Sequence, residues 1–140
     1  AMPGSVFYKL NFIQEELLKF WYFGDFSKFH YNLKQSDKYL VEAKTLFEYK
    51  QYLLANKALL KSDLYFQKLK PVLLTAKDHG KDIGEKSTLL NSASKKHVET
   101  LKKIIIAVPQ VFEWKPEKEN PTNLKLRENL KRSIRIREAI

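Results

Sequence analysis

Residues 25–76 read DFSKFHYNLKQSDKYLVEAKTLFEYKQYLLANKALLKSDLYFQKLKPVLLTA, and their regular apolar spacing is the clearest indication of the fold. Apolar and small residues recur in it every three or four positions, in two successive series: Phe26, Phe29, Leu33, Ser36, Leu40, Ala43 and Phe47, and then Tyr52, Ala55, Leu59, Ser62, Phe66, Leu69 and Leu73. This spacing places one apolar stripe along each of two helices. The two series also align at an offset of 26 residues, because Ser36-Asp37-Lys38-Tyr39-Leu40 matches Ser62-Asp63-Leu64-Tyr65-Phe66. The stretch therefore predicts a helical hairpin with two similar arms.

The ends of the two arms are indicated by local signals. The first arm is expected over residues 25–48, because Gly24 ends a preceding helix and Asp25 can cap the next one. The second arm is expected over residues 52–78, although Pro71 lies inside it. Proline removes one backbone hydrogen bond and clashes with the preceding turn, so we expect a kink or a helix end near Lys70.

Two further stripes predict a helix on each side of the hairpin. Residues 5–23 carry Leu10, Ile13, Leu17 and Phe20 at helical spacing, which predicts a short helix packed against the hairpin. The alternative for its aromatic cluster, Phe20-Trp21-Tyr22-Phe23, is a surface for a partner or for a lipid interface. The stripe on the other side covers residues 83–108 and ends at Pro109; it consists of Ile83, Leu90, Ala93, His97, Leu101, Ile104 and Val108.

Length and composition favour one packed helical domain. The chain has 140 residues, 44% of them apolar, and its four glycines and five prolines supply too few turns for a many-stranded β fold. The predicted fold is an all-α antiparallel bundle of about four helices, formed by residues 1–109, with a tetratricopeptide-like hairpin at its centre. Residues 110–140 are expected to form a proline-containing linker and then a basic helix over residues 124–139, packed on the bundle or extending from it.

The formal net charge of +10 favours an anionic partner, such as a wall polymer, lipid headgroups, an acidic protein or nucleic acid. A nucleic-acid reader usually gathers its cations on one element and interleaves them with exposed aromatic residues. Here the cations are spread over every predicted helix, and the aromatic residues lie mostly on the core stripes. We therefore favour a solvated basic surface over a nucleic-acid site. The candidate contact residues are Lys95, Lys96, Lys102, Lys103, Lys125, Arg127, Lys131, Arg132, Arg135 and Arg137.

The sequence contains no pattern that indicates catalysis, and we expect a protein that is not an enzyme and has no cofactor. Without cysteine the chain has neither thiolate catalysis nor cysteine-ligated zinc. Residues 80–87, Gly-Lys-Asp-Ile-Gly-Glu-Lys-Ser, differ from a phosphate-binding loop in their spacing, and no strand precedes them. The carboxylate pairs Glu15-Glu16 and Asp78 with Asp82 are expected on solvated helix faces or caps.

The three histidines are the remaining candidates for chemistry. His97 lies on an apolar stripe, where a core histidine hydrogen-bonded to a neighbouring helix is the expected arrangement. A metal site would require His30, His79 and His97 to meet in the folded protein, because no two of them share helical spacing. We therefore predict no metal site.

Several segments resemble a bacterial family known as domain of unknown function 5667. Residues 3–10, PGSVFYKL, resemble its opening PGSxxYxLK, and residues 36–43, SDKYLVEA, resemble its ADKRLAEA segment. Residues 52–59, YLLANKAL, resemble its YxLAxKAL segment, and residues 96–101 with Val108-Pro109 resemble its ending KHxxVLxxxxxxVP. The resemblance covers residues 3–109 and ends there.

The resemblance implies an all-helical domain that lies outside the cytoplasm, usually behind a signal or membrane-anchoring helix. No apolar run in the chain approaches the roughly 18 residues of a membrane helix. We therefore expect that an N-terminal anchor was removed upstream of Pro3. The function expected from residues and resemblance together is an interaction or scaffold domain of a bacterial envelope protein, which binds an anionic partner through a basic surface. The alternative is a nucleic-acid-binding protein that uses its basic C-terminal segment.

Overall fold

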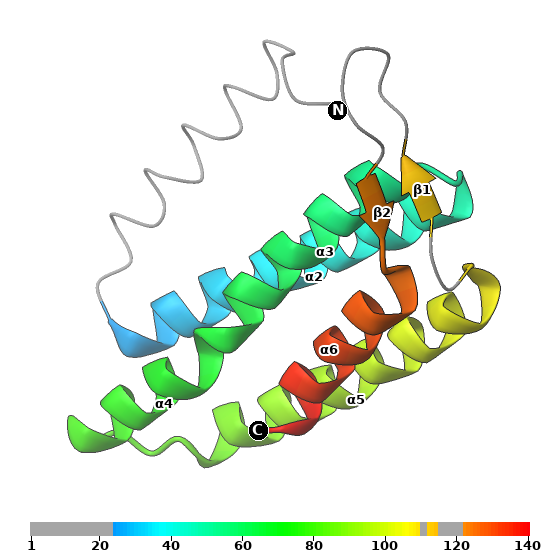
Figure 1. Ribbon diagram of the computed structural model, residues 1–140. Coiled ribbons are helices and arrows are strands. Elements are labelled where there is room, and N and C mark those ends of the chain that lie inside the picture. Colours follow the sequence, from blue (N-terminus) through cyan, green and yellow to red (C-terminus); the bar gives the residue numbers. More distant parts are fainter. Residues whose placement is uncertain (1–23, 110–111, 115–121) are drawn as a thin grey trace, which may run out of the picture.

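The computed structural model describes residues 24–109, 112–114 and 122–140, and it confirms an all-α bundle (Figure 1). The helices are α2 (Asp25–Glu48), α3 (Tyr52–Gln67), α4 (Leu69–Asp78), α5 (Gly84–Ala107) and α6 (Leu126–Glu138). The predicted helix over residues 5–23 lies outside the described residues. Within the described part of the chain, no helix is both long and apolar enough to cross a bilayer.

The hairpin predicted from residues 25–76 is confirmed, with α2 as its first arm and α3 followed by α4 as its second. The interruption of the second arm falls at Lys68, two residues before the predicted position. Pro71 is then the third residue of α4, within the first helical turn, where a missing N–H costs little. The proline therefore places the boundary one turn upstream of its own ring.

The turn between α2 and α3 is closed by a left-handed residue that is not glycine. Lys50 has φ 59°, its N–H donates to the Phe47 carbonyl, and the N–H of Gln51 donates to the Leu46 carbonyl. These two bonds form a Schellman motif, which satisfies carbonyls at the end of α2. The same pair of bonds closes α4, where Gly80 supplies the left-handed residue with φ 82°.

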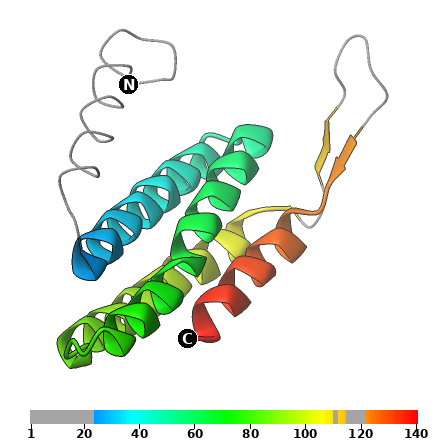
Figure 2. The ribbon, with the colours of Figure 1, turned by 90° about the vertical axis from the view of Figure 1, so that its left-hand side faces the viewer.

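Two apolar clusters hold the bundle together. The first joins α2, α3, α5 and α6, and it contains Leu40, Ala43, Phe47, Ala55, Ala58, Leu59, Leu101, Ile104, Val108, Leu126 and Leu130. The second lies at the other end, joins α2, α3, α4 and α5, and contains Phe29, Leu33, Phe66, Leu69, Leu73, Leu90 and Ala93. Figure 2 shows the two pairs α2–α3 and α5–α6 from the side, with α6 lying along α5.

The last helix belongs to the body of the bundle. Leu126 and Leu130 are fully buried, and α6 packs against both α3 and α5. Before it, β1 (Phe112–Trp114) pairs antiparallel with β2 (Thr122–Leu124), with Glu113 opposite Asn123. Parts of the segment expected to be an irregular linker are thus a two-stranded ribbon, which leads directly into α6 (Figure 2).

Candidate functional site

A buried polar network crosses the bundle, and Arg137 of α6 is at its centre. The side chain of Arg137 is fully buried, and its Nη1 donates to Asp63 Oδ1 over 2.6 Å. Its Nε donates to His97 Nδ1 over 2.9 Å, and its Nη2 donates to Ser62 Oγ over 2.7 Å. Ser133 Oγ also donates to the Asp63 carboxylate, over 2.6 Å. The network therefore ties α6 to α3 and α5 through charge-assisted hydrogen bonds.

The prediction that Arg137 is a surface contact residue is wrong. Position 137 is in helical phase with Leu126, Leu130 and Ser133, which all face the core. Burial lowers the pKa of the Arg137 guanidinium, whereas the hydrogen bond and the charge of Asp63 act in the opposite direction. Arginine keeps its proton in proteins, so Arg137 is a buried cation whose charge is matched inside the fold.

His97 is the core histidine that its position on the stripe predicts, and both of its ring nitrogens have partners. The guanidinium N–H of Arg137 has no lone pair to offer, so Nδ1 of His97 must accept that hydrogen bond. The proton of the neutral ring then lies on Nε2, which is 2.5 Å from Asp37 Oδ1. Because both nitrogens are engaged, this histidine has no free lone pair for a metal ion or for proton abstraction from a substrate.

The other two histidines lie in separate surroundings. His79 Nδ1 is 2.9 Å from Asp25 Oδ2, in the turn that follows α4. His30 is exposed on α2, and partial burial together with the charge of Lys86 lowers its pKa. Among the described residues, no group of three or more histidine, aspartate, glutamate or cysteine side chains is arranged to hold a metal ion.

The nine other predicted contact residues are all exposed, but the structure distributes them over several surfaces. Lys96 lines a groove of 410 Å³ between α2 and α5, whereas Arg132 and Arg135 line another groove, between α6 and the α3–α4 junction. Arg127 donates from Nε to the Val108 carbonyl over 3.2 Å and so closes the end of α5. On α6 itself, Arg127, Lys131 and Arg135 are exposed at intervals of four residues, so these three cations share one stripe of the helix.

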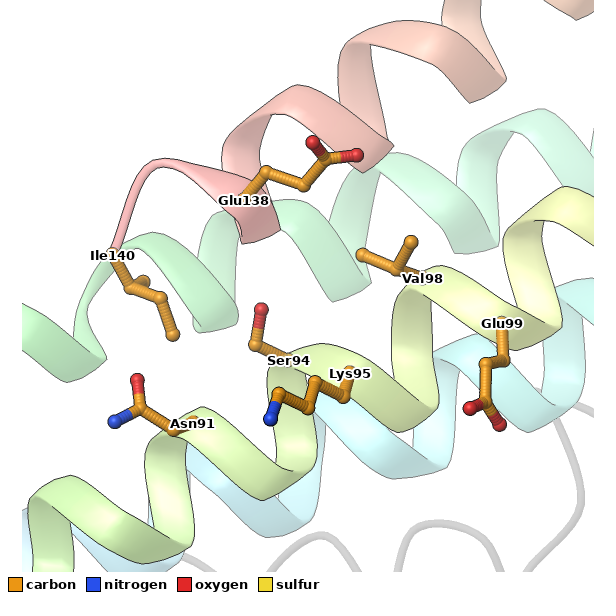
Figure 3. Close-up of a pocket in the computed structure, with 7 residues that line it drawn as sticks. All are labelled: Asn91, Ser94, Lys95, Val98, Glu99, Glu138 and Ile140. Atoms are coloured by element: carbon orange, nitrogen blue, oxygen red, sulfur yellow. The ribbon is translucent and has the colours of Figure 1, made fainter.

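Lys95 belongs to a groove of mixed charge. This groove has a volume of 670 Å³ and lies between α5 and the end of α6 (Figure 3). Figure 3 shows Lys95 and Glu99 on α5 and Glu138 on α6 around it. Ser94, at its inner side, donates to the Arg137 carbonyl over 2.5 Å. Two carboxylates beside one lysine make this groove a poor site for an anion.

The groove between α6 and the α3–α4 junction has a different character. It has a volume of 500 Å³, and Lys70 of α4 faces it together with Arg132 and Arg135. Among the residues that the structure describes, those lining it include no carboxylate side chain. Phe66, Pro71 and Ile136 supply apolar surface beside the three cations. Sequence reasoning did not select Lys70, although its place next to Pro71 at a helix interruption put it near an irregular surface.

We call this groove the basic groove. Its three cations come from two segments that are more than 60 residues apart in the sequence, so only the packing of α6 on the hairpin brings them together. No protein-family model matches the chain, and neither a curated protein nor a solved structure matches it.

Proposed function

We propose that the protein is a non-enzymatic helical interaction domain that binds an anionic partner through its basic surface. The observation that carries the proposal is the basic groove, which has a volume of 500 Å³ and is lined by Lys70, Arg132 and Arg135. None of its described lining residues has a carboxylate side chain, so no acidic side chain of the lining offsets the three positive charges. Two arginines add planar donors that match carboxylate and phosphate groups.

The polar network supports a structural rather than a catalytic role for the strongest acid-base candidates. His97 has both nitrogens engaged, and Asp63 is paired with Arg137 at 2% side-chain exposure. A general base must reach a substrate proton. Asp63 faces Arg137 inside the bundle, and His97 lines the groove between α2 and α5 with both of its ring nitrogens already hydrogen-bonded.

The resemblance to domain of unknown function 5667 supports a position in the bacterial envelope, outside the cytoplasm. In that setting, the anionic partners of suitable chemistry are wall polymers, lipid headgroups and acidic proteins. The two arms of the hairpin, which pack through Ser36 and Ser62, would serve as a tetratricopeptide-like scaffold for this contact.

The proposal is tested by titrating the protein with inorganic polyphosphate across a range of salt concentrations. The groove variant carries Lys70→Gln, Arg132→Gln and Arg135→Gln, and the matched control carries Lys95→Gln, Lys102→Gln and Lys103→Gln. Both variants lose three positive charges, so an effect of net charge alone would weaken polyphosphate binding equally in the two. We expect the groove variant to bind at least about tenfold more weakly than the control, with a smaller salt dependence. Equal affinities of the two variants would contradict the proposal.

Parallel titrations with duplex and single-stranded DNA test the alternative function. The exposed stripe of Arg127, Lys131 and Arg135 on α6 makes a nucleic-acid reader the second candidate function. DNA binding that is much tighter than polyphosphate binding at the same charge concentration would favour nucleic acid and overturn the envelope interpretation.

A further inference from the structure

We propose that the outward face of α3 and α4 binds the surface of an anionic lipid bilayer. The inference rests on the proposed function, because it names the anionic partner. The two helices follow one another almost in line along the outside of the bundle (Figure 1). Lys70 and Pro71 connect this face to the basic groove, since both residues line the groove and both are exposed on α4.

The charge of this face is mainly positive, and its one exposed carboxylate is Asp78, the last residue of α4. From Tyr52 to Lys77 the chain contains a single carboxylate, Asp63, which is buried against Arg137 and contributes nothing to the surface. The lysines of the same stretch are all exposed: Lys57, Lys61, Lys68, Lys70 and Lys77. With five exposed lysines against the one exposed carboxylate of Asp78, this surface gains energy near anionic headgroups.

Leucines lie among these lysines on the outer side of α3. Leu60 is 48% exposed and Leu64 is 53% exposed, one helical turn apart. Lys57, Lys61, Leu64 and Lys68 follow one another at intervals of four, three and four residues, so they form a single stripe on the outer side. On α4, Leu74 is 50% exposed as well.

This alternation of apolar and cationic side chains distinguishes a bilayer from a soluble polyanion. A wall polymer or polyphosphate gains nothing from exposed leucines, whereas the boundary between headgroups and acyl chains accepts leucine while the headgroups attract lysine. Long lysine side chains also reach from an apolar contact to the headgroups.

Two tyrosines border the face on the side of α2 and fit the same environment. The rings of Tyr39 and Tyr65 stack with centroids 5.9 Å apart. Lys61 Nζ lies 5.3 Å from the Tyr39 centroid, and Lys68 Nζ lies 4.9 Å from the Tyr65 centroid. Tyrosine is enriched at membrane–water interfaces, because its ring is apolar and its hydroxyl is polar.

The test is co-sedimentation with vesicles of phosphatidylcholine, with and without phosphatidylglycerol, at low and high salt. One variant carries Leu60→Ser and Leu64→Ser, and its control carries Val41→Ser and Ile106→Ser, two exposed apolar residues on other helices. A second variant carries Lys57→Gln, Lys61→Gln and Lys68→Gln, with the Lys95, Lys102 and Lys103 variant as its control. Circular dichroism and thermal melting establish that each variant is folded.

We expect binding to the phosphatidylglycerol vesicles alone, weakened at least about tenfold by each face variant and much less by its control. Equal weakening by a face variant and its control would overturn the inference. Polyphosphate binding without vesicle binding would also overturn it while leaving the proposed function intact. If the wild-type protein bound neither polyphosphate nor vesicles, the proposed function itself would be rejected.

Discussion

At the scale of single residues, the main finding is that one arginine organises the interior. The 26-residue offset in the sequence has a direct counterpart here, because the aligned serines meet: Ser62 Oγ donates to the Ser36 carbonyl over 2.7 Å. Arg137 then donates to the same Ser62 hydroxyl and to Asp63. The two arms of the hairpin and the last helix are thus joined at one point.

Removal of one partner of the buried ion pair should strongly destabilise the fold. Arg137→Met leaves the Asp63 carboxylate, at 2% side-chain exposure, without its cation, and we expect a loss of about 3–5 kcal/mol in the free energy of unfolding. Urea denaturation measures this loss. The double variant Asp63→Leu with Arg137→Met should recover much of it, because no buried charge remains. A loss below about 1 kcal/mol in Arg137→Met would show that water reaches the Arg137–Asp63 ion pair in solution.

The hydrogen bond from Arg137 also fixes the tautomer of His97. We expect the neutral ring to carry its proton on Nε2, because Nδ1 accepts from Arg137 and Nε2 faces Asp37. Long-range ¹H–¹⁵N correlation spectra distinguish the two tautomers of a histidine. A proton on Nδ1 would mean that the bond from Arg137 does not form in solution.

The sequence predicted correctly that His97 is buried, whereas Arg137 was wrongly expected at the surface. The stripe of α5 placed His97 inside, where the two nitrogens of a neutral ring need only one hydrogen-bond donor and one acceptor. In the structure Arg137 is in helical phase with the buried Leu126 and Leu130, but burying a guanidinium requires a carboxylate partner. That partner, Asp63, is 74 residues away, and nothing local in the sequence connects the two.

At the scale of elements, the boundaries follow local chemistry where a special residue marks them. The expected bounds of α2 agree with the structure, and Pro71 marked the interruption of the second arm to within two residues. The closure of α2 had no such marker, because Lys50 adopts the left-handed conformation that glycine usually supplies. The break in the apolar spacing placed this turn at residues 49–51, where the structure has it, but no residue there indicated the left-handed conformation of Lys50.

The two Schellman turns provide a matched pair of substitutions. Lys50→Gly should raise the free energy of unfolding by about 0.5–1 kcal/mol, because it relieves the left-handed strain at φ 59°. Gly80→Ala should lower the free energy of unfolding by a similar amount. An added Cβ meets no atom within 4 Å, so the only cost is the strain of a non-glycine residue at φ 82°. Thermal melting of both variants measures the effects. Stabilisation by Gly80→Ala would contradict the assigned turn.

The start of α2 is tied to the α4–α5 turn by a pH-sensitive contact. The hydrogen bond from His79 lowers the pKa of Asp25 below its ordinary value of 3.8, with further help from Lys81 and partial opposition from burial. A lowered carboxyl pKa contributes stability that is present above the ordinary value and is lost as the pH falls through the lower value of the folded state.

Asp25→Asn should therefore lower stability near neutral pH and flatten the loss of stability on acidification below about pH 4. Denaturation at a series of pH values measures both effects. A variant with the same acid dependence as the wild-type protein would show that Asp25 gains nothing from these contacts.

At the scale of the whole molecule, charge and packing decide where a partner can bind. The net charge of +10 is known from the sequence, and the two apolar clusters of the structure contain most of the residues on the predicted stripes. The net charge and the stripes do not show that Asp63 is hidden by Arg137, which leaves Asp78 as the one exposed carboxylate among the lysines of α3 and α4. Nor do they show that Lys70 joins Arg132 and Arg135, because α6 must first pack against the hairpin.

An NMR titration of the wild-type protein with inorganic polyphosphate locates the anion-binding site on the fold. It maps the bound anion onto the fold without any substitution. The proposal predicts that the largest backbone shifts occur around Lys70, Arg132 and Arg135 and diminish as salt is added. Shifts that centre on Lys95, Lys102 and Lys103 of α5, or no shifts at low salt, would contradict it.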